Sequence, residues 1–232
     1  MTQVTPRTGW PLAPLTLAVG AIPFIVVHIA WLMSLRSGYI DACNPYLAGC
    51  TSISAAARHG APNVLFKAVM LPYTTLLLAY WLAAAHWLSL VGGRSRMVAW
   101  IVPLAVAASA FLALYAVFLG SDGHFYQLMR RYGVMVYFAG SFFAQLLFAL
   151  RLSTLARAGR FPSRWIPRTK LALSLVVLAL GLTNYTGALL LDDKNALENA
   201  IEWQAALLMS AWYLVTWAAW RGDGYRVDAG RG

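Results

Sequence analysis

The chain has 232 residues, of which 60% are hydrophobic and only 11% are charged, and its mean hydropathy is +0.63. A soluble globular domain carries about 25% charged residues, so this composition excludes that class and indicates a membrane protein with several spans. Its polar segments are too short to build a second hydrophobic core, which favours a single membrane domain over residues 1–232.

Long apolar segments follow one another along the chain. A polar stretch precedes the first, which at about 22 residues exceeds the apolar region of a signal peptide, so we expect a retained helix. Each segment is long enough to cross a hydrocarbon core of about 30 Å as a helix. Backbone groups in lipid must be satisfied internally, and the alternating pattern of a membrane barrel is absent. The sequence therefore predicts an all-α bundle of six transmembrane helices, over residues 13–34, 64–91, 98–119, 132–154, 170–191 and 200–220, with an outer loop at 35–63.

The basic residues divide unequally between the two sides of this topology, and the positive-inside rule then places both termini in the cytoplasm. Twelve of the 18 lie on that side: Arg7, Arg94, Arg96, Arg151, Arg157, Arg160, Arg164, Arg168, Lys170, Arg221, Arg226 and Arg231. Six lie on the other: Arg36, Arg58, Lys67, Arg130, Arg131 and Lys194. The acidic residues predicted on the outer side are Asp41, Asp122, Asp192, Asp193, Glu198 and Glu202. Only Asp223 and Asp228 are predicted on the cytoplasmic side. The net charge of +10 is thus a property of the cytoplasmic side and is no indication of nucleic-acid binding.

The loop over residues 156–170 has the sequence ARAGRFPSRWIPRTK, in which five basic residues alternate with aromatic residues and prolines. One interpretation is contact with anionic lipid headgroups, at about 1 kcal/mol per basic residue. The other is a determinant of topology without a binding role.

Cys43 and Cys50 are the two cysteines of the chain, and the predicted topology places both in the outer loop. Outside the reducing cytoplasm, a structural disulfide that closes a short loop is expected. Thiol exchange with a quinone is the alternative, but such enzymes generally need a second cysteine pair to relay electrons.

The four histidines do not form a recognisable metal or haem site, so we expect neither a metal nor another cofactor. His28 and His86 fall in opposite leaflets, about 20 Å apart at about 1.5 Å per residue, and cannot ligate one iron. His59 and His124 lack the HxxxH or HExxH spacing. His86 is interpreted as a residue at the membrane boundary.

His28, Lys67 and Glu202 are the ionisable residues predicted inside or beside the outer leaflet, where such groups usually pair or serve a site. Lys67 and Glu202 both lie near the outer end of a helix, so a pair of Glu202 with Lys67 or with His28 is allowed. The alternative is that these charges simply reach interfacial water.

Two further classes of function remain open. A lipid acyl hydrolase or acyltransferase would use Ser52 or Ser54 as nucleophile with His28, His59 or His124 as base, although no GxSxG motif is present. A small-molecule or proton-coupled transporter would use His28 and Glu202 as a relay, although no paired helix breaks mark a binding site at mid-membrane.

The segment CNPYLAGCTSISAAARHGAPNVLFKAVMLPY at residues 43–73 resembles the first non-cytoplasmic loop and second helix of the Frag/DRAM/Sfk group. That group includes damage-regulated autophagy modulators and Golgi proteins of GPI-anchor lipid remodelling. The matching features are the run Thr51-Ser52-Ile53-Ser54-Ala55-Ala56, the break at Gly60 and Pro62, and Glu202-Trp203. Thr51 stands where many members have proline. The resemblance implies a six-helix, lipid-associated protein without catalytic residues to carry over.

These observations favour a protein that binds or organises a lipid, or its headgroup, at the extracytoplasmic leaflet. The expected headgroup site comprises Ser52, Ser54 and Arg58, with Lys67, His28 and Glu202 below them, a set suited to an anionic phosphate. The expected partners are membrane lipids and not nucleic acid, and no protein partner is indicated. The Arg- and Ala-rich composition is typical of a GC-rich bacterial genome, which predicts the bacterial inner membrane.

Overall fold

The computed structural model describes residues 9–191 and 193–227, which are almost entirely helical. Six long helices dominate these ranges: α1 (Ala13–Arg36), α4 (Gly60–Gly92), α5 (Arg96–Phe118), α6 (His124–Arg157), α7 (Trp165–Leu190) and α8 (Asn195–Asp223). Two one-turn helices, α2 (Pro45–Ala48) and α3 (Ile53–Ala56), lie between α1 and α4. Two-residue strands, β1 (Trp10–Pro11) and β2 (Arg226–Val227), form an antiparallel pair.

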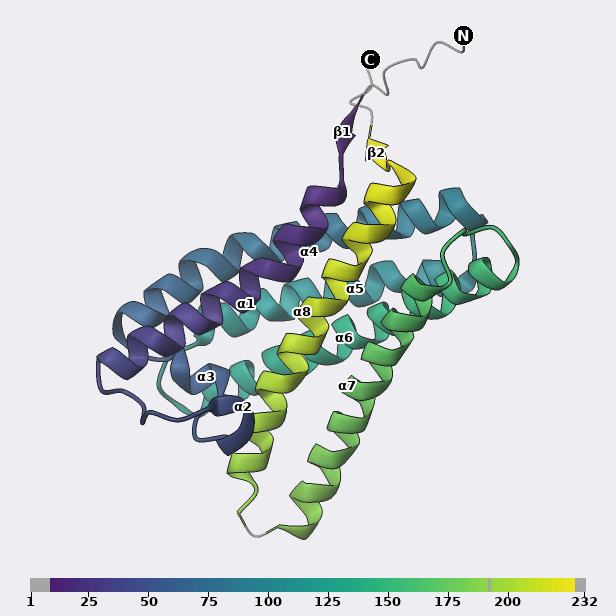
Figure 1. Ribbon diagram of the computed structural model, residues 1–232. Coiled ribbons are helices and arrows are strands. Elements are labelled where there is room, and N and C mark those ends of the chain that lie inside the picture. Colours follow the sequence, from purple (N-terminus) through teal and green to yellow (C-terminus); the bar gives the residue numbers. More distant parts are fainter. Residues whose placement is uncertain (1–8, 192, 228–232) are drawn as a thin grey trace.

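Successive long helices run in opposite directions, as Figure 1 shows; their connections are short except for the segment between α1 and α4. α5 packs between α4 and α6, α1 packs against α4 and α8, and α7 packs against α6 and α8. The strands β1 and β2 meet at one end of this bundle, which we call the terminal end. The segment 37–59, with α2 and α3, lies at the opposite end, and we call it the lid.

Five of the six long helices, α1, α4, α5, α6 and α7, are long and apolar enough to cross a membrane. Within the described ranges this architecture indicates an integral membrane protein. α8 has the length of a span but is not among the five, because Trp, Tyr and polar residues occupy much of it. Three of its tryptophans face the protein interior: Trp203, Trp212 and Trp220 are at most 1% exposed.

The helices extend beyond several of the predicted spans. α6 begins at His124 rather than at 132, and α7 begins at Trp165 rather than at 170. Both extensions are rich in polar and aromatic residues, so a search for long apolar runs misses them. Four charges used in predicting the orientation, Arg7, Asp192, Asp228 and Arg231, lie outside the described residues.

Small residues set the closest helix contacts. A Cβ added at Gly133 of α6 would lie 2.9 Å from the backbone nitrogen of Tyr115 in α5, and one at Gly20 of α1 would lie 2.9 Å from the Ser210 carbonyl oxygen in α8. Apolar side chains gain little by leaving lipid for a helix interface, so close backbone approach at such positions is a main source of packing energy in membrane bundles.

At the terminal end, hydrogen bonds join α4 to the end of α8 and to the residues that follow it. Tyr225, which follows α8, donates a hydrogen bond to the Ala83 carbonyl oxygen and pairs with Nδ1 of His86. Trp87 Nε1 donates to the Asp223 carboxylate at 2.8 Å. Burial raises the pKa of the Tyr225 hydroxyl, which therefore stays protonated at neutral pH. His86 thus joins α4 to the end of α8 in addition to lying near the predicted boundary.

Candidate functional site

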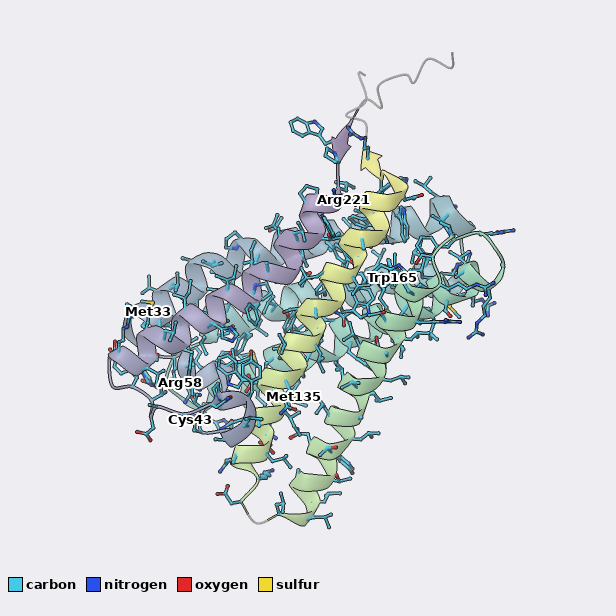
Figure 2. All side chains as sticks on the ribbon, in the orientation of Figure 1. Met33, Cys43, Arg58, Met135, Trp165 and Arg221 are labelled. Atoms are coloured by element: carbon cyan, nitrogen blue, oxygen red, sulfur yellow. A yellow bond between two sulfur atoms is a disulfide. The ribbon has the colours of Figure 1, made fainter. Side chains whose placement is uncertain are left out.

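The lid is a compact cap made of two helical turns and a disulfide. Cys43 and Cys50 form that disulfide, as the sequence predicts, with their Cα atoms 6.5 Å apart. It encloses α2, whose first turn is capped by the Asn44 side chain. Figure 2 shows Cys43 and Arg58 on the lid side of the bundle, far from Trp165 and Arg221 near the terminal end.

Three side chains of α8 attach the lid to the bundle through its backbone carbonyl groups. Asn199 Nδ2 donates to Gly49 at 2.8 Å, Trp203 Nε1 to Thr51 at 2.9 Å and Gln204 Nε2 to Tyr46 at 2.7 Å. We call Asn199, Trp203 and Gln204 the latch. Trp203 is predicted from the sequence as part of the Glu202-Trp203 pair. Asn199 and Gln204 are not predicted, although two amides on either side of a tryptophan at the start of a long helix are a detectable signal.

Gly49 is the position where the lid approaches α8 most closely. Its φ is +58°, in the left-handed region, and an added Cβ would lie 1.7 Å from the Ala196 carbonyl oxygen. A side chain there is excluded both by backbone conformation and by space. The close approach brings the carbonyl of Gly49 within reach of Asn199.

A cavity of about 60 Å³ lies beneath the lid, inside the bundle. On the scale where one water needs about 10–15 Å³, it has room for roughly four to six waters. Phe24 and Leu207, two of its lining residues, are 38% and 40% exposed, so part of its wall reaches the outer surface of the bundle. Polar lining residues near the lid are His28, Tyr46 and Glu202, and apolar or aromatic side chains of α1, α4, α5, α6 and α8 line most of the rest.

His28 is held by partners on both ring nitrogens. Nδ1 lies 2.6 Å from the Phe24 carbonyl oxygen, which can only accept, so Nδ1 carries the proton. Nε2 lies 2.9 Å from the Tyr46 hydroxyl and, in the neutral ring, accepts from it. Burial raises the pKa of Tyr46, which keeps this donor protonated at neutral pH. The ring of Trp203 packs edge-on against His28, with centroids 5.4 Å apart.

Glu202 lies in the second turn of α8 and lines the cavity beside His28. The backbone N–H groups of Ile53 and Ser54, at the start of α3, hydrogen-bond to its carboxylate. A carboxylate has about four acceptor positions, so two donors leave capacity toward the cavity. Among the described residues, neither Lys67 nor His28 lies within 4 Å of it as an ion-pair partner.

The two serines have local structural partners. Ser52 Oγ caps α3 by accepting from the Ala55 backbone N–H at 3.0 Å, and Ser54 Oγ lies 2.8 Å from the Tyr115 hydroxyl. Within the described chain, no histidine is hydrogen-bonded to either hydroxyl. The geometry therefore offers no base for a serine nucleophile at these positions.

The two basic residues of the predicted headgroup site do not line the cavity. Arg58 follows α3 and interacts electrostatically with Glu202, and its buried Nε has no hydrogen-bond partner among the described residues. Lys67 is half-buried in α4, also away from the lining. Of the six predicted headgroup residues, the cavity thus contains His28 and Glu202 in its wall.

Lys170 is fully buried in α7, which its place among the basic residues of the predicted cytoplasmic side does not indicate. Its Nζ donates to the Trp212 carbonyl oxygen at 3.0 Å and to Thr216 Oγ1 at 2.7 Å, and lies 3.0 Å from the centroid of the Trp212 ring. Thr216 Oγ1 in turn lies 3.0 Å from the Tyr80 hydroxyl. These contacts tie α7 and α4 to α8.

The described residues contain no group of three or more His, Cys, Asp or Glu side chains arranged to hold a metal ion. The cavity wall instead contains the Glu202 carboxylate, which has spare acceptor capacity, and the hydrogen-bonded pair of the His28 imidazole and the Tyr46 phenol.

Comparison with known proteins finds no matching family model, no matching curated protein and no matching solved structure.

Proposed function

We propose that this chain is an integral membrane protein that binds the polar headgroup of a lipid in the cavity beneath the lid. One observation carries the proposal: Glu202, a carboxylate with spare acceptor capacity, lines a cavity whose wall is otherwise largely apolar. Ionisable groups at such positions in membrane proteins usually serve a site.

The size of the cavity determines which part of a lipid would enter it. A space of about 60 Å³, with room for roughly four to six waters, suits the terminal polar atoms of a headgroup and is too small for an acyl chain as well. The exposed faces of Phe24 and Leu207 at its wall are apolar and suit the start of an acyl chain. The chains would therefore remain in the surrounding bilayer while the headgroup occupies the cavity.

Charge complementarity favours a headgroup that donates hydrogen bonds, and above all a protonated amine. The side chains facing the cavity near the lid supply a carboxylate and a hydroxyl, whereas Arg58 and Lys67 lie away from the lining. A charge-assisted hydrogen bond from an ammonium group to Glu202 is of the stronger class. We favour this class over the anionic phosphate that the sequence suggests.

The proposal includes the finer topology. α8 serves as the sixth span, with both termini in the cytoplasm of a bacterial cell and the lid facing outward. The alternating direction of the six long helices and the position of β1 and β2 at one end support an even number of crossings. In this orientation the disulfide of the lid lies in an oxidising compartment.

Membership in the Frag/DRAM/Sfk group is part of the same proposal. The two segments that carry the resemblance meet in space: Glu202 accepts from Ile53 and Ser54, and Trp203 donates to Thr51. Because the two segments bind each other, a change of residue type in one of them would weaken its contact with the other.

The test compares lipids that differ only in headgroup. Full-length protein in a neutral detergent is titrated with fluorescent phosphatidylethanolamine, which has ammonium N–H donors, and with phosphatidylcholine, which has none. We expect Glu202→Gln to weaken phosphatidylethanolamine binding roughly tenfold, the equivalent of one lost charge-assisted contact, and to leave phosphatidylcholine binding unchanged.

Glu198→Gln is the matched control, because Glu198 lies one turn earlier in α8 and pairs with Lys194 at 3.4 Å. It removes the same charge from the same helix without touching the cavity. If Glu202→Gln binds phosphatidylethanolamine as tightly as the Glu198→Gln protein, the headgroup does not reach Glu202 and the proposal is wrong.

A further inference from the structure

A second hollow lies at the terminal end of the bundle, between the end of α6 and the start of α7. It has a volume of about 370 Å³, well above that of the cavity beneath the lid. Its lining comprises Ser153, Ala156, Arg157, Arg164, Pro167, Arg168 and Leu171. We call it the arginine groove.

Three guanidinium groups line this groove without an acidic partner. Arg157, Arg164 and Arg168 are all exposed, and the described residues provide none of them with a side-chain hydrogen bond or an ion pair. The sequence from Gly123 to Leu191 contains no Asp or Glu, so no carboxylate on α6, α7 or their connection can neutralise them. Three cationic side chains around one hollow, with no carboxylate beside them on these elements, favour an anionic ligand.

The rest of the groove is apolar. Ala156 and Pro167 are buried and Leu171 is half-buried, so together they form an apolar wall beside the arginines. Below Leu171, the residues Leu175, Leu178 and Leu182 are 60%, 43% and 58% exposed. The spacing of four, three and four residues keeps these leucines on one face of α7. The arginine groove is therefore followed along α7 by an exposed apolar stripe.

The neighbouring aromatic residue fits a membrane boundary at this level. Trp165 opens α7 and is 55% exposed, and Figure 2 shows it at the start of that helix. Exposed tryptophans concentrate at the level of lipid headgroups. Lys170 does not line the groove, because its amine donates hydrogen bonds to Trp212 and Thr216 on α8.

We propose that the arginine groove is a binding site for one anionic phospholipid, whose phosphate contacts Arg157, Arg164 and Arg168 and whose acyl chain lies along the leucine stripe of α7. Arginine is the residue best suited to phosphate, because its planar fork donates two parallel hydrogen bonds. The apolar wall and stripe argue for a lipid rather than free phosphate. This site is independent of the cavity beneath the lid and lies at the other end of the bundle.

The experiment titrates full-length protein in neutral detergent with fluorescent phosphatidylglycerol and follows thermal unfolding of each variant as a folding check. The test variant is Arg157→Gln/Arg164→Gln/Arg168→Gln. The matched control is Arg94→Gln/Arg96→Gln/Arg160→Gln, which removes three exposed charges outside the groove lining, one from the connection between α4 and α5 and one from the first residue of α5.

We expect the test variant to bind phosphatidylglycerol on the order of 100-fold more weakly, at about fivefold per arginine, and the control variant to lose less than about fivefold. Neither variant should change binding of phosphatidylcholine. An excess of inorganic phosphate should fail to displace the bound lipid, because it lacks the chain contacts. Should the triple variant unfold, the single substitutions are each expected to show the fivefold loss.

Three results would overturn the inference. Equal weakening in both triple variants would mean diffuse attraction to a basic surface. Unchanged binding in the test variant would mean that no lipid contacts the groove. Complete displacement by inorganic phosphate would identify free phosphate as the ligand. Glu202→Gln should leave phosphatidylglycerol binding intact, so failure here is distinguishable from failure of the cavity proposal.

Discussion

Glu202 of α8 and Lys170, which packs against α8 from α7, are two ionisable residues that are accommodated in different ways. Lys170 is fully buried and donates to Trp212 and Thr216 while its charge lies over the Trp212 ring. Glu202 is half-buried and accepts from the lid backbone on one side while a cavity adjoins it on the other.

The difference separates a structural charge from a charge available to a ligand. A buried ionic group with internal partners and packed surroundings offers nothing for a further molecule to bind. A group that has spare hydrogen-bonding capacity and lies beside a cavity can bind a further molecule. We therefore expect substitutions around Lys170 to change stability, and substitutions at Glu202 to change binding far more than stability.

The largest effect is expected for Lys170→Ala. Truncation leaves a cavity between α7 and α8 and removes both hydrogen bonds, which should cost about 3–5 kcal/mol of unfolding free energy. Lys170→Met, which keeps the volume, should cost about 1 kcal/mol, because Thr216 retains its contact with Tyr80. Thermal unfolding followed by circular dichroism compares the two. Equal damage by both variants would show that the amine with its hydrogen bonds, and not the volume of the side chain, is required.

The next largest effect concerns the disulfide of the lid. Replacing Cys43 and Cys50 with alanine should cost about 2–3 kcal/mol, the usual range for a bridge that closes a short loop. Since the lid covers the cavity, phosphatidylethanolamine binding should also weaken. A double variant that melts later or binds unchanged would mean that the latch alone holds the lid in place.

A smaller effect is expected from the indole hydrogen bond of the latch. Trp203→Phe removes the donor to the Thr51 carbonyl and should cost about 1–2 kcal/mol beyond the loss of ring volume. Trp220→Phe is the control, because its buried Nε1 has no partner among the described residues and therefore no hydrogen bond to lose. The difference between the two melting shifts measures the Trp203 bond, and a difference of zero would contradict its role.

The smallest stability effect is expected for Glu202→Gln. The amide oxygen of glutamine still accepts from the backbone of the lid, so unfolding free energy should fall by about 1 kcal/mol or less. The same melting measurements apply. A loss as large as that of Lys170→Ala would place Glu202 with the structural charges and remove the contrast between the two regions.

The sequence determined much of the architecture, because its strongest signals are local. Residue hydropathy predicted the positions of all six long helices, and the predicted side of the membrane made a Cys43–Cys50 disulfide the expected state. His28 and Glu202 stood out as ionisable groups near the end of apolar segments, and both line the cavity. Each of these predictions needs only residue type and distance along the chain.

Tertiary structure alone decided which face each residue presents. Lipid and protein interior are both apolar, so hydropathy along a membrane helix carries little information about which side turns inward. For this reason the sequence did not reveal that Lys170 is buried against α8, that Asn199 and Gln204 hold the lid, or that Arg58 and Lys67 lie away from the cavity that Glu202 lines.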